Sequence, residues 1–474
     1  MHFFKEFDEI TKIPRPSHHE ECIADYLLNW AKAHDLSALK DDFNNVIITK
    51  PASIGYENFA PIALQAHTDM VCEKAEGIDH DFFNDPITYF VDDDIVSTHG
   101  RTTLGADDGL GMAMILAILS DDTLCHPKLE ALFTTAEEED FRGVENLDAT
   151  PLTAKHLINI DHCDDTSILC ASAGGITFTA THPYTLKSDL TLKPLHITLS
   201  GLMGGHSGED IGNGRGNANI LLCRLLQRLL PFGVQLNYLC GGTFRLAIPR
   251  SASCTLLIPP EQYDTVCREI DAFKAVIQNE YVQFPTVTID YEGCDCDGTY
   301  VDETTLREFI HYGLTIPNGV FEMSATFKNI VDTSSNFGEV YMQDHAIVTV
   351  VDIRSNYDSK LTRLTDMLSI LATQFGLDYT IWGRYTPWKY QAHSPLRDLM
   401  YAVYSELSGQ PPRIEAVHAG LECGFLSDKG FTDIISIGAN AENFHSPAEH
   451  FSLTSADYVY RALVKVLNDA KFTS

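Results

Sequence analysis

A histidine and an aspartate stand at the end of an apolar segment that reads as a strand. Residues 61–66 are mostly apolar, His67 follows them, and Asp69 comes two positions later. Residues i and i+2 of a strand point to the same side, so Asp69 can orient the His67 ring and raise its basicity. The pattern therefore predicts a metal-binding histidine with its supporting carboxylate. An isolated His-x-Asp motif also occurs as a simple hydrogen-bonded strand end.

Further side chains with metal-binding chemistry follow along the chain. Asp107 lies in a glycine-rich turn before an apolar helical segment, Glu137 and Glu138 follow a second apolar run, Asp161 follows a third, and His445 lies near the C-terminal end. Each also has an ordinary structural interpretation, such as a helix cap, a solvated acidic loop or a polar strand terminus. The joint occurrence of all of them favours a metal centre.

These side chains together supply the nitrogen and oxygen ligands that two divalent cations need. Zinc suits such a mixed set, and manganese or cobalt can fill the same ligands. Two ions roughly 3.5–4 Å apart can polarise a carbonyl and lower the pKa of a shared water, and a spare glutamate can take the proton of that water. The set predicts a two-metal hydrolase.

The apolar spacing predicts alternating strands and helices in the first part of the chain. Amphipathic or apolar helices are expected at 18–34 and 109–119, and strands at 44–49, 62–66, 129–135 and 156–160. Alternation of this kind favours an α/β sheet, and the polar candidates lie just past strand ends, where open α/β sheets place their sites.

The pattern changes near residue 186 and returns to helix–strand alternation after Pro387. Between them, β-branched strands are separated by predicted helices at 217–230, 260–278 and 359–375. We therefore expect a catalytic α/β domain in two pieces, 1–185 and 385–474, with a mixed central sheet flanked by helices. An α+β lid domain is inserted at 186–384, and its length would accommodate two subdomains.

Composition narrows the range of partners. The 474 residues are 44% hydrophobic and 21% charged, with a formal net charge of −33, which argues against a nucleic-acid or anionic-membrane partner. No apolar run reaches membrane-spanning length, and the N-terminal residues do not read as a signal peptide. Twelve cysteines without a Cys-x-x-Cys pattern are typical of free thiols in a reducing cytoplasm.

With these motifs in place, the chain resembles the M20 metallopeptidase clan and, within it, the Xaa-His dipeptidase family. The resemblance extends over essentially the whole chain. It is carried by the segments 10–17, 65–71, 103–111, 130–138, 204–208, 247–250, 418–424 and 445–447.

The resemblance implies metal ligands by position. Asp107 would bridge the two ions, His67 and Asp161 would complete one site, and Glu138 and His445 would complete the other. It also implies a cis peptide bond between Asp107 and its successor.

The resemblance implies roles for four more residues. Glu137 would be the general base, and Asp69 would hold the first histidine. In the inserted domain, His206 would stabilise the oxyanion of the tetrahedral intermediate, and Arg354 would bind the C-terminal carboxylate of the substrate. The alternative for Arg354 is a surface strand arginine in an ion pair.

The chain departs from the family pattern at a few positions. Ala136, Asp140, Cys163, His162 and Leu246 replace the usual residues, and none of these changes removes a proposed ligand or the base. His162 and Leu246 bear on substrate preference.

The implied activity is that of a two-zinc exopeptidase that hydrolyses unblocked dipeptides, including Xaa-His, by attack of a metal-bridging water. The alternatives are a tripeptidase or an N-acyl amino acid amidohydrolase of the same clan, and a relative that binds peptides without hydrolysing them. Both a monomer and a homodimer are compatible with the sequence.

Overall fold

The chain forms two compact units in the computed structural model, which describes residues 2–283 and 286–473. Unit 1 comprises Met1–Ser172, Trp388–Ala416 and Leu421–Ser474, and unit 2 comprises Ala173–Pro387 and Val417–Gly420. The expected boundaries at 185/186 and 384/385 differ from this division. The reason is that strand β9 (Gly174–Pro183) pairs with β18 and β19 in the sheet of unit 2.

Unit 1 is built on an eight-stranded mixed sheet, which confirms the predicted α/β class. The strand order is β1-β2-β6-β3-β7-β21-β8-β20, and β3, β6, β7 and β21 run parallel while β1, β2 and β8 pair antiparallel. The strands are β1 (Ser37–Lys40), β2 (Val46–Lys50), β3 (Ile62–His67), β6 (Leu129–Thr134), β7 (His156–Asn159), β8 (Ser167–Ser172), β20 (Arg413–Val417) and β21 (Asp433–Ser436).

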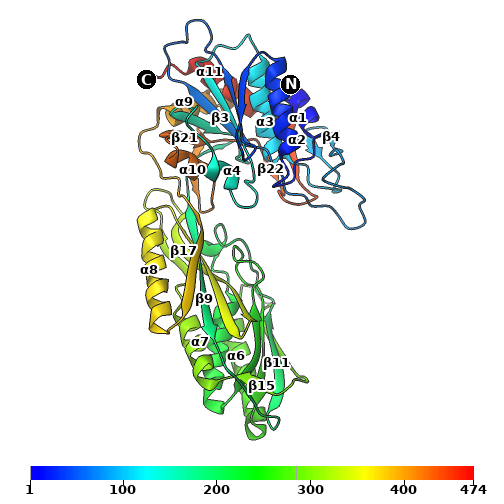
Figure 1. The fold of residues 1–474 in the computed structure, drawn as a ribbon, viewed down its shortest axis with the longest axis vertical. Helices are drawn as coiled ribbons and strands as arrows, with labels where there is room; N and C mark the ends of the chain where they lie inside the picture. The colour runs from blue at the N-terminus through cyan, green and yellow to red at the C-terminus, as the bar shows by residue number, and fades with distance from the viewer. Residues whose placement is uncertain (1, 284–285, 474) are drawn as a thin grey trace. The chain divides into compact units, whose positions relative to one another are not determined.

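Helix α3 (Ala106–Ser120) is the most buried helix-forming segment of unit 1. It is apolar around its whole circumference, as expected for a helix enclosed by protein, and it packs against both β3 and α1 (Figure 1). Asp107 and Asp108 have non-helical φ and ψ angles, so the regular part of the helix follows them, in line with the predicted start at residue 109. The other helices of unit 1 are α1 (His2–Ile10), α2 (Glu21–Ala33), α4 (Arg142–Asn146), α9 (Pro395–Ser408), α10 (Glu422–Asp428) and α11 (Leu453–Asp469).

A small sheet of short strands also belongs to unit 1. Its order is β22-β23-β5-β4, formed by β22 (Ala441–Glu442), β23 (His450–Ser452), β5 (Ile95–Ser97) and β4 (Phe90–Asp92). The loop that carries His445 connects β22 to β23, so this small sheet anchors both ends of that loop.

Unit 2 contains a nine-stranded antiparallel sheet. The order is β14-β11-β13-β12-β17-β18-β9-β19, with β16 also paired to β17. Its two halves join where β12 and β17 pair at only two positions, Cys240 with Tyr341 and Gly241 with Val340. The strands are β11 (Lys193–Ser200), β12 (Gln235–Gly241), β13 (Ala252–Ile258), β14 (Thr288–Gly293), β16 (Gly319–Met323), β17 (Val331–Gln343), β18 (Ala346–Ser355) and β19 (Asp378–Tyr385), together with β9.

Four long helices pack on this sheet. They are α5 (Ala218–Leu229), α6 (Tyr263–Glu280), α7 (Glu303–Thr315) and α8 (Asp358–Gln374), and α8 lies along β9 and β18 (Figure 1). Short β10 (Leu186–Ser188) and β15 (Thr299–Val301) form a separate pair. The sequence predicted α5, α6 and α8 but not α7 or the long strand β17. Within the described ranges, no helix has the length and apolar character needed to cross a membrane.

The core of unit 2 encloses a histidine that has no polar partner. His182 of β9 is almost fully buried against the rings of Phe309 and Tyr312, and neither ring nitrogen makes a hydrogen bond within the described part of the chain. Burial lowers the pKa of His182 to about 4. Because the folded pKa lies below the unfolded value, the neutral ring favours folding above about pH 6.5, and this contribution is lost as the pH falls towards 4.

We predict that His182→Phe removes part of the acid sensitivity of unit 2. The wild-type protein should lose on the order of 3 kcal/mol of folding free energy between pH 7 and pH 4 through this residue, and the variant should not. Urea unfolding followed at several pH values measures the difference. His311→Phe, an exposed histidine on α7, is the matched control. Equal acid sensitivity in His182→Phe and wild type would contradict the prediction.

Candidate active site

The ends of three neighbouring parallel strands bring the predicted strand-end residues together. Strands β6, β3 and β7 are adjacent and parallel, so their carboxyl ends lie at one edge of the sheet. His67 is the last residue of β3, Glu138 follows β6, and Asp161 follows β7. His67 and Glu138, which are 71 positions apart in the chain, thus become neighbours because of the strand order.

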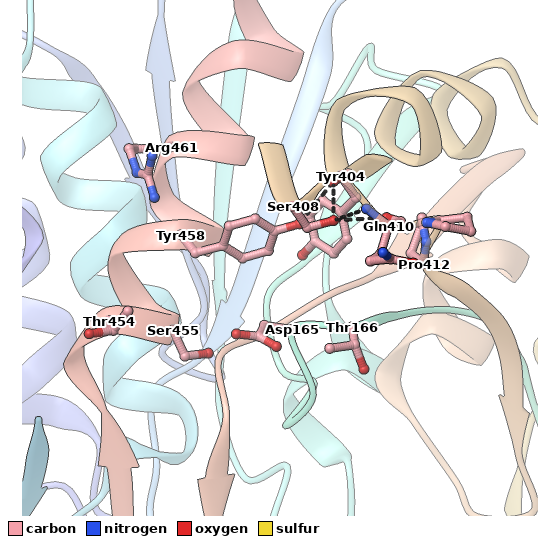
Figure 2. Close-up of a pocket in the computed structure, with 11 residues that line it drawn as sticks. Asp165, Thr166, Tyr404, Ser408, Gln410, Pro412, Thr454, Ser455, Tyr458 and Arg461 are labelled. Carbon is pink, nitrogen blue, oxygen red and sulfur yellow. Dashed lines mark hydrogen bonds between the residues drawn. The ribbon is translucent and has the colours of Figure 1, made fainter. Parts of the chain in front are cut away.

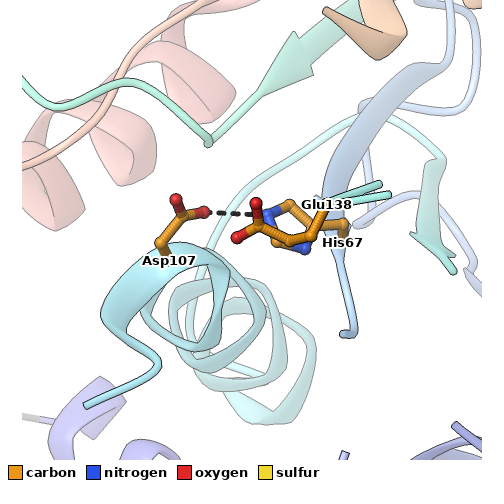
Figure 3. Close-up of side chains that lie close together, drawn as sticks. All are labelled: His67, Asp107 and Glu138. Atoms are coloured by element: carbon orange, nitrogen blue, oxygen red, sulfur yellow. Dashed lines mark hydrogen bonds and ion pairs between the residues drawn. The ribbon is translucent and has the colours of Figure 1, made fainter. Parts of the chain in front are cut away.

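Asp107 stands between the two histidines. Its Oδ1 lies 2.8 Å from His67 Nε2, and its Oδ2 lies 3.5 Å from His445 Nε2 (Figure 3 shows the first contact). On the His445 side, Glu138 Oε2 is 2.8 Å from the same Nε2, and on the His67 side, Asp161 Oδ1 is 3.8 Å from Nε2. All five predicted ligands therefore converge around one carboxylate, and the peptide bond after Asp107 is cis, as the resemblance implied.

The charges at this place are unbalanced. Burial and the neighbouring Asp107 raise the pKa of both Glu138 and Asp161. Burial also opposes ionisation of Asp107, but hydrogen bonds with His445 and His67 outweigh it and lower the Asp107 pKa. The hydrogen bonds of His445 with Asp107 and with Glu138 raise the pKa of His445 to about 10.

This crowding fits a site for cations. Ligand atoms of His67, Asp107 and Glu138 all lie within 4.8 Å of one another (Figure 3). Oε1 of Glu138 is buried without a hydrogen-bond partner in the described structure. Carboxylates that repel one another and an acceptor that lacks a donor are what a bound divalent ion would satisfy, and mixed imidazole and carboxylate donors suit zinc.

Asp69 does more than support a histidine. Its Oδ1 is 3.4 Å from His67 Nδ1, in agreement with the predicted pair. The same carboxylate accepts hydrogen bonds from the backbone N–H of Glu137 at 3.0 Å and of Glu138 at 3.2 Å, and from Ser17 Oγ at 2.7 Å. Burial opposes its charge, but these donors and His67 lower the pKa of Asp69. Asp69 therefore fixes the loop after β6 and lies beside the ring of His67.

Two further charged residues support the site, and the sequence did not suggest a role for either. Arg15 is buried and donates to the carbonyl oxygens of Thr68, Asp69 and Gly105. Glu449, which precedes β23, is buried against the start of α3. Its carboxylate accepts hydrogen bonds from the backbone N–H groups of residues 104, 105, 106 and 107, with N···O distances of 2.7, 3.0, 2.8 and 3.4 Å in that order. Arg15 and Ser17 lie in the segment 10–17 that carries the family resemblance, whereas nothing in the sequence marked Glu449.

Glu137 lies beside the ligands without being tied to them. Its side chain is half-buried, and no described residue donates a hydrogen bond to its carboxylate, although its backbone N–H is held by Asp69. Burial raises the pKa of Glu137 well above its ordinary value, with His67 opposing the shift. A carboxylate with a raised pKa and an accessible oxygen can accept a proton from a water and release it again.

His206 and Arg354 belong to unit 2, where they lie near each other. Burial and the charge of Arg354 lower the pKa of His206 to about 4. His206 Nδ1 accepts the backbone N–H of Glu209 at 3.2 Å, so the proton of the neutral ring is on Nε2 and is available for donation.

Arg354 is buried and not on the surface. Its Nε donates to Asp352 Oδ2 at 3.1 Å and its Nη2 donates to Ser207 Oγ at 3.3 Å, so it is ion-paired inside the unit. His418, from the segment 418–424, is also buried in unit 2, with Nε2 2.7 Å from Ser334 Oγ. Burial and the nearby Arg354 lower the pKa of His418 to about 3.

A separate cavity of about 380 Å³ in unit 1 contains none of the predicted site residues. It lies among the end of α9, the start of α11 and the loop at 410–412, and Tyr404 and Tyr458 form part of its wall (Figure 2). Its polar groups are largely engaged within the protein, for example Ser408, which donates to the carbonyl oxygens of Tyr404 and Gln410. The cluster around Asp107 therefore remains the candidate active site.

Comparisons with known proteins agree with this fold. A scaffold that converges histidines and carboxylates at a sheet edge is typical of metal-dependent hydrolases. The chain belongs to the peptidase family M20/M25/M40, whose model matches residues 63–469.

Individual relatives are similar over almost the full length. The chain is 36% identical to the cytosol non-specific dipeptidase of Escherichia coli (strain K12), covering 98% of this chain and 96% of that protein. Its structure matches that of aminoacylhistidine dipeptidase from Vibrio alginolyticus with a TM-score of 0.89, at 33% identity, over 100% of this chain and 97% of the other. Aminopeptidase PepT from Bacillus cereus shares the fold, with a TM-score of 0.61 at 14% identity over 99% and 98% of the two chains.

We predict that Asp69→Ala destabilises unit 1 by about 2–4 kcal/mol, because it leaves the N–H groups of Glu137 and Glu138 without their acceptor. Ser17→Ala, which removes only one donor to the same carboxylate, should cost about 1 kcal/mol. Urea unfolding in the presence of a chelator measures both without a contribution from metal binding. A loss in Asp69→Ala no larger than in Ser17→Ala would refute the role of Asp69 in fixing the loop.

Proposed function

We propose that the protein is a two-metal dipeptidase that hydrolyses the peptide bond of an unblocked dipeptide and releases its two amino acids. The observation that carries this proposal is the position of Asp107, which presents one carboxylate oxygen to each of two histidines. Family membership makes a peptide-bond hydrolase the expected class of enzyme.

The ligand assignment follows the two sides of Asp107. His67 and Asp161 would hold one cation, Glu138 and His445 would hold the other, and Asp107 would bind both. We propose zinc, with manganese or cobalt as ions that could occupy the same donors. When bound, the ions would supply Lewis-acid chemistry, which polarises the scissile carbonyl and acidifies a water.

Residues of the chain would then transfer the proton of the attacking water. Glu137 accepts the proton of the attacking water and delivers it to the amine that leaves, which requires a carboxyl group able to hold and release a proton near neutral pH. Asp69 keeps Glu137 in place through the backbone hydrogen bond at 3.0 Å. These two roles explain why the adjacent glutamates differ. Glu138 contacts His445, whereas the carboxylate of Glu137 accepts no hydrogen bond from a described residue.

Unit 2 would contribute substrate binding. We propose that the Nε2–H of neutral His206 donates to the negative charge that develops on the carbonyl oxygen, and that Arg354 binds the terminal carboxylate of the dipeptide. Arg354 Nη1 has no partner among the described residues, while Nε and Nη2 are held by Asp352 and Ser207, so the guanidinium is oriented before substrate arrives.

The names of the relatives guide substrate class and location. The Escherichia coli relative is a non-specific dipeptidase of the cytosol and the Vibrio relative is an aminoacylhistidine dipeptidase. We therefore propose broad dipeptide specificity that includes Xaa-His, and a cytoplasmic location.

We predict that Glu137→Gln lowers turnover of a dipeptide at least about 100-fold, because a carboxamide cannot accept the proton of the water. The variant should still bind as many metal ions as the wild type, which atomic absorption of the purified proteins measures. Glu139→Gln, on the exposed next-but-one position of the same loop, is the control and should keep full activity. Turnover retained by Glu137→Gln would remove this residue from the role of base.

A substrate panel tests the proposed specificity. Ala-His and Leu-Gly should be hydrolysed, whereas a tripeptide and an N-acetyl amino acid should not, because a carboxylate-binding group and a free N-terminus define the length of a dipeptide. A chelator should abolish the activity, and added zinc or manganese should restore it. Preferred cleavage of the tripeptide or of the N-acetyl compound would identify the corresponding alternative activity, and hydrolysis that resists complete removal of metal would refute the two-metal mechanism.

A further inference from the structure

A buried carboxyl group near the candidate metal site is not used in the mechanism above. Glu422, the first residue of α10, is fully buried in unit 1. Its Oε2 accepts hydrogen bonds from Gln65 Nε2 at 2.6 Å and from Thr134 Oγ1 at 2.7 Å. Its Oε1 has no hydrogen-bond partner in the described structure. An ionisable group in such a place opposes folding unless its partners compensate, so an apolar side chain would serve the fold better.

The partners of Glu422 form a polar row across three adjacent strands. Gln65 of β3 and Asn159 of β7 are register partners, and Asn159 Nδ2 donates to Gln65 Oε1 at 2.7 Å. Thr134 of β6 is the register partner of His67. The three polar residues precede, by two or three positions, the strand-end groups of the active site, which are His67, Glu137 and Asp161.

This row connects the ends of the strands through side chains as well as through the backbone. The hydrogen bonds among these side chains tie the three strands to α10, so a shift of any one of these elements breaks a bond of the network. Glu422 closes the network from a helix far away in the sequence, more than 280 residues after Thr134. Displacement of Glu422 would therefore be transmitted to the ligand-bearing ends of β3, β6 and β7.

The charge of Glu422 also acts on the site. Burial raises its pKa to about 7, and the opposing effects of His67 and of the bonds from Thr134 and Gln65 do not reverse the shift. Ionisable groups face it from several neighbouring elements. They are His67 at the end of β3, Asp69 after β3, Glu137 after β6, Asp161 after β7 and Cys423 in α10. Its charge is thus set near neutral pH, next to the place proposed for two cations.

We propose that Glu422 is a positioning residue of the metal centre, which aligns the ends of β3, β6 and β7 through Gln65 and Thr134 and strengthens cation binding by its negative charge. The inference rests on the proposed two-metal function. No hydrogen bond connects Glu422 to an assigned ligand within the described residues, so it acts through its partners and through its field and does not coordinate an ion.

Zinc affinity measured by chelator competition on metal-free protein at pH 8 and pH 6 tests this proposal. Glu422→Gln keeps the size of the side chain and an acceptor for Gln65 and Thr134 but removes the charge. It should bind zinc at least about tenfold more weakly than wild type at pH 8. The difference should shrink at pH 6, because wild-type Glu422 is then largely protonated before metal binds.

A second buried glutamate provides a matched control. Glu130 of β6 is as buried as Glu422, but its carboxylate accepts the backbone N–H groups of Thr153 and Ala154 at the opposite end of the strand. Glu130→Gln should lower stability while leaving zinc affinity unchanged at both pH values. This comparison separates a specific effect on the metal centre from a general loss of packing.

The outcomes are distinguishable. Equal zinc affinity of wild type and Glu422→Gln at pH 8, or a deficit of the same size at pH 6, overturns the role of Glu422. A wild-type protein that binds no divalent cation refutes the proposed function itself. If Glu422→Gln does not fold, Thr134→Val decides the question: it removes one donor to the carboxylate and should weaken zinc binding, and unchanged affinity in that variant overturns the proposal.

Discussion

Negative charge gathered at one buried sheet edge is the constraint on which the rest of unit 1 depends. Parallel strands β6, β3 and β7 end side by side, and Asp107 is brought to the same place at the start of α3. Carboxylates this close raise one another's pKa, so the arrangement is stable only with histidines, protons or cations among them. The site therefore needs positive charge among its carboxylates, which a bound cation would supply.

The protein holds this charge in place largely with backbone donors. Asp69 accepts N–H groups from the loop after β6, and Glu449 accepts N–H groups from the start of α3, where the helix dipole also favours an anion. Arg15 neutralises part of the field while its guanidinium is occupied by three carbonyl oxygens. Because these contacts go to the backbone, they fix the segments that bear the proposed ligands without competing for the proposed ligand atoms.

Unit 2 uses a different kind of electrostatic control. Arg354 is buried and oriented by Asp352, and burial together with the Arg354 charge keeps the neighbouring His206 neutral. A neutral histidine whose Nδ1 already accepts a hydrogen bond presents a single N–H, which makes it a donor of defined direction. Burial and the same charge lower the pKa of His418, so both rings near Arg354 stay neutral and leave the guanidinium as the principal cation of the cluster.

The sequence by itself named the side chains that gather at the candidate site, because their types and their places after apolar runs are local properties. His67, Asp107, Glu138, Asp161 and His445 could all be named from it, as could the α/β class of unit 1. The tertiary structure alone decided how they are supported. Arg15, Glu422 and Glu449 act across separations of up to 357 residues, and Asp69 proved to bind a loop besides its histidine. Strand β9 joined unit 2 for the same reason, since pairing partners are chosen by sheet order and burial, which no local pattern encodes.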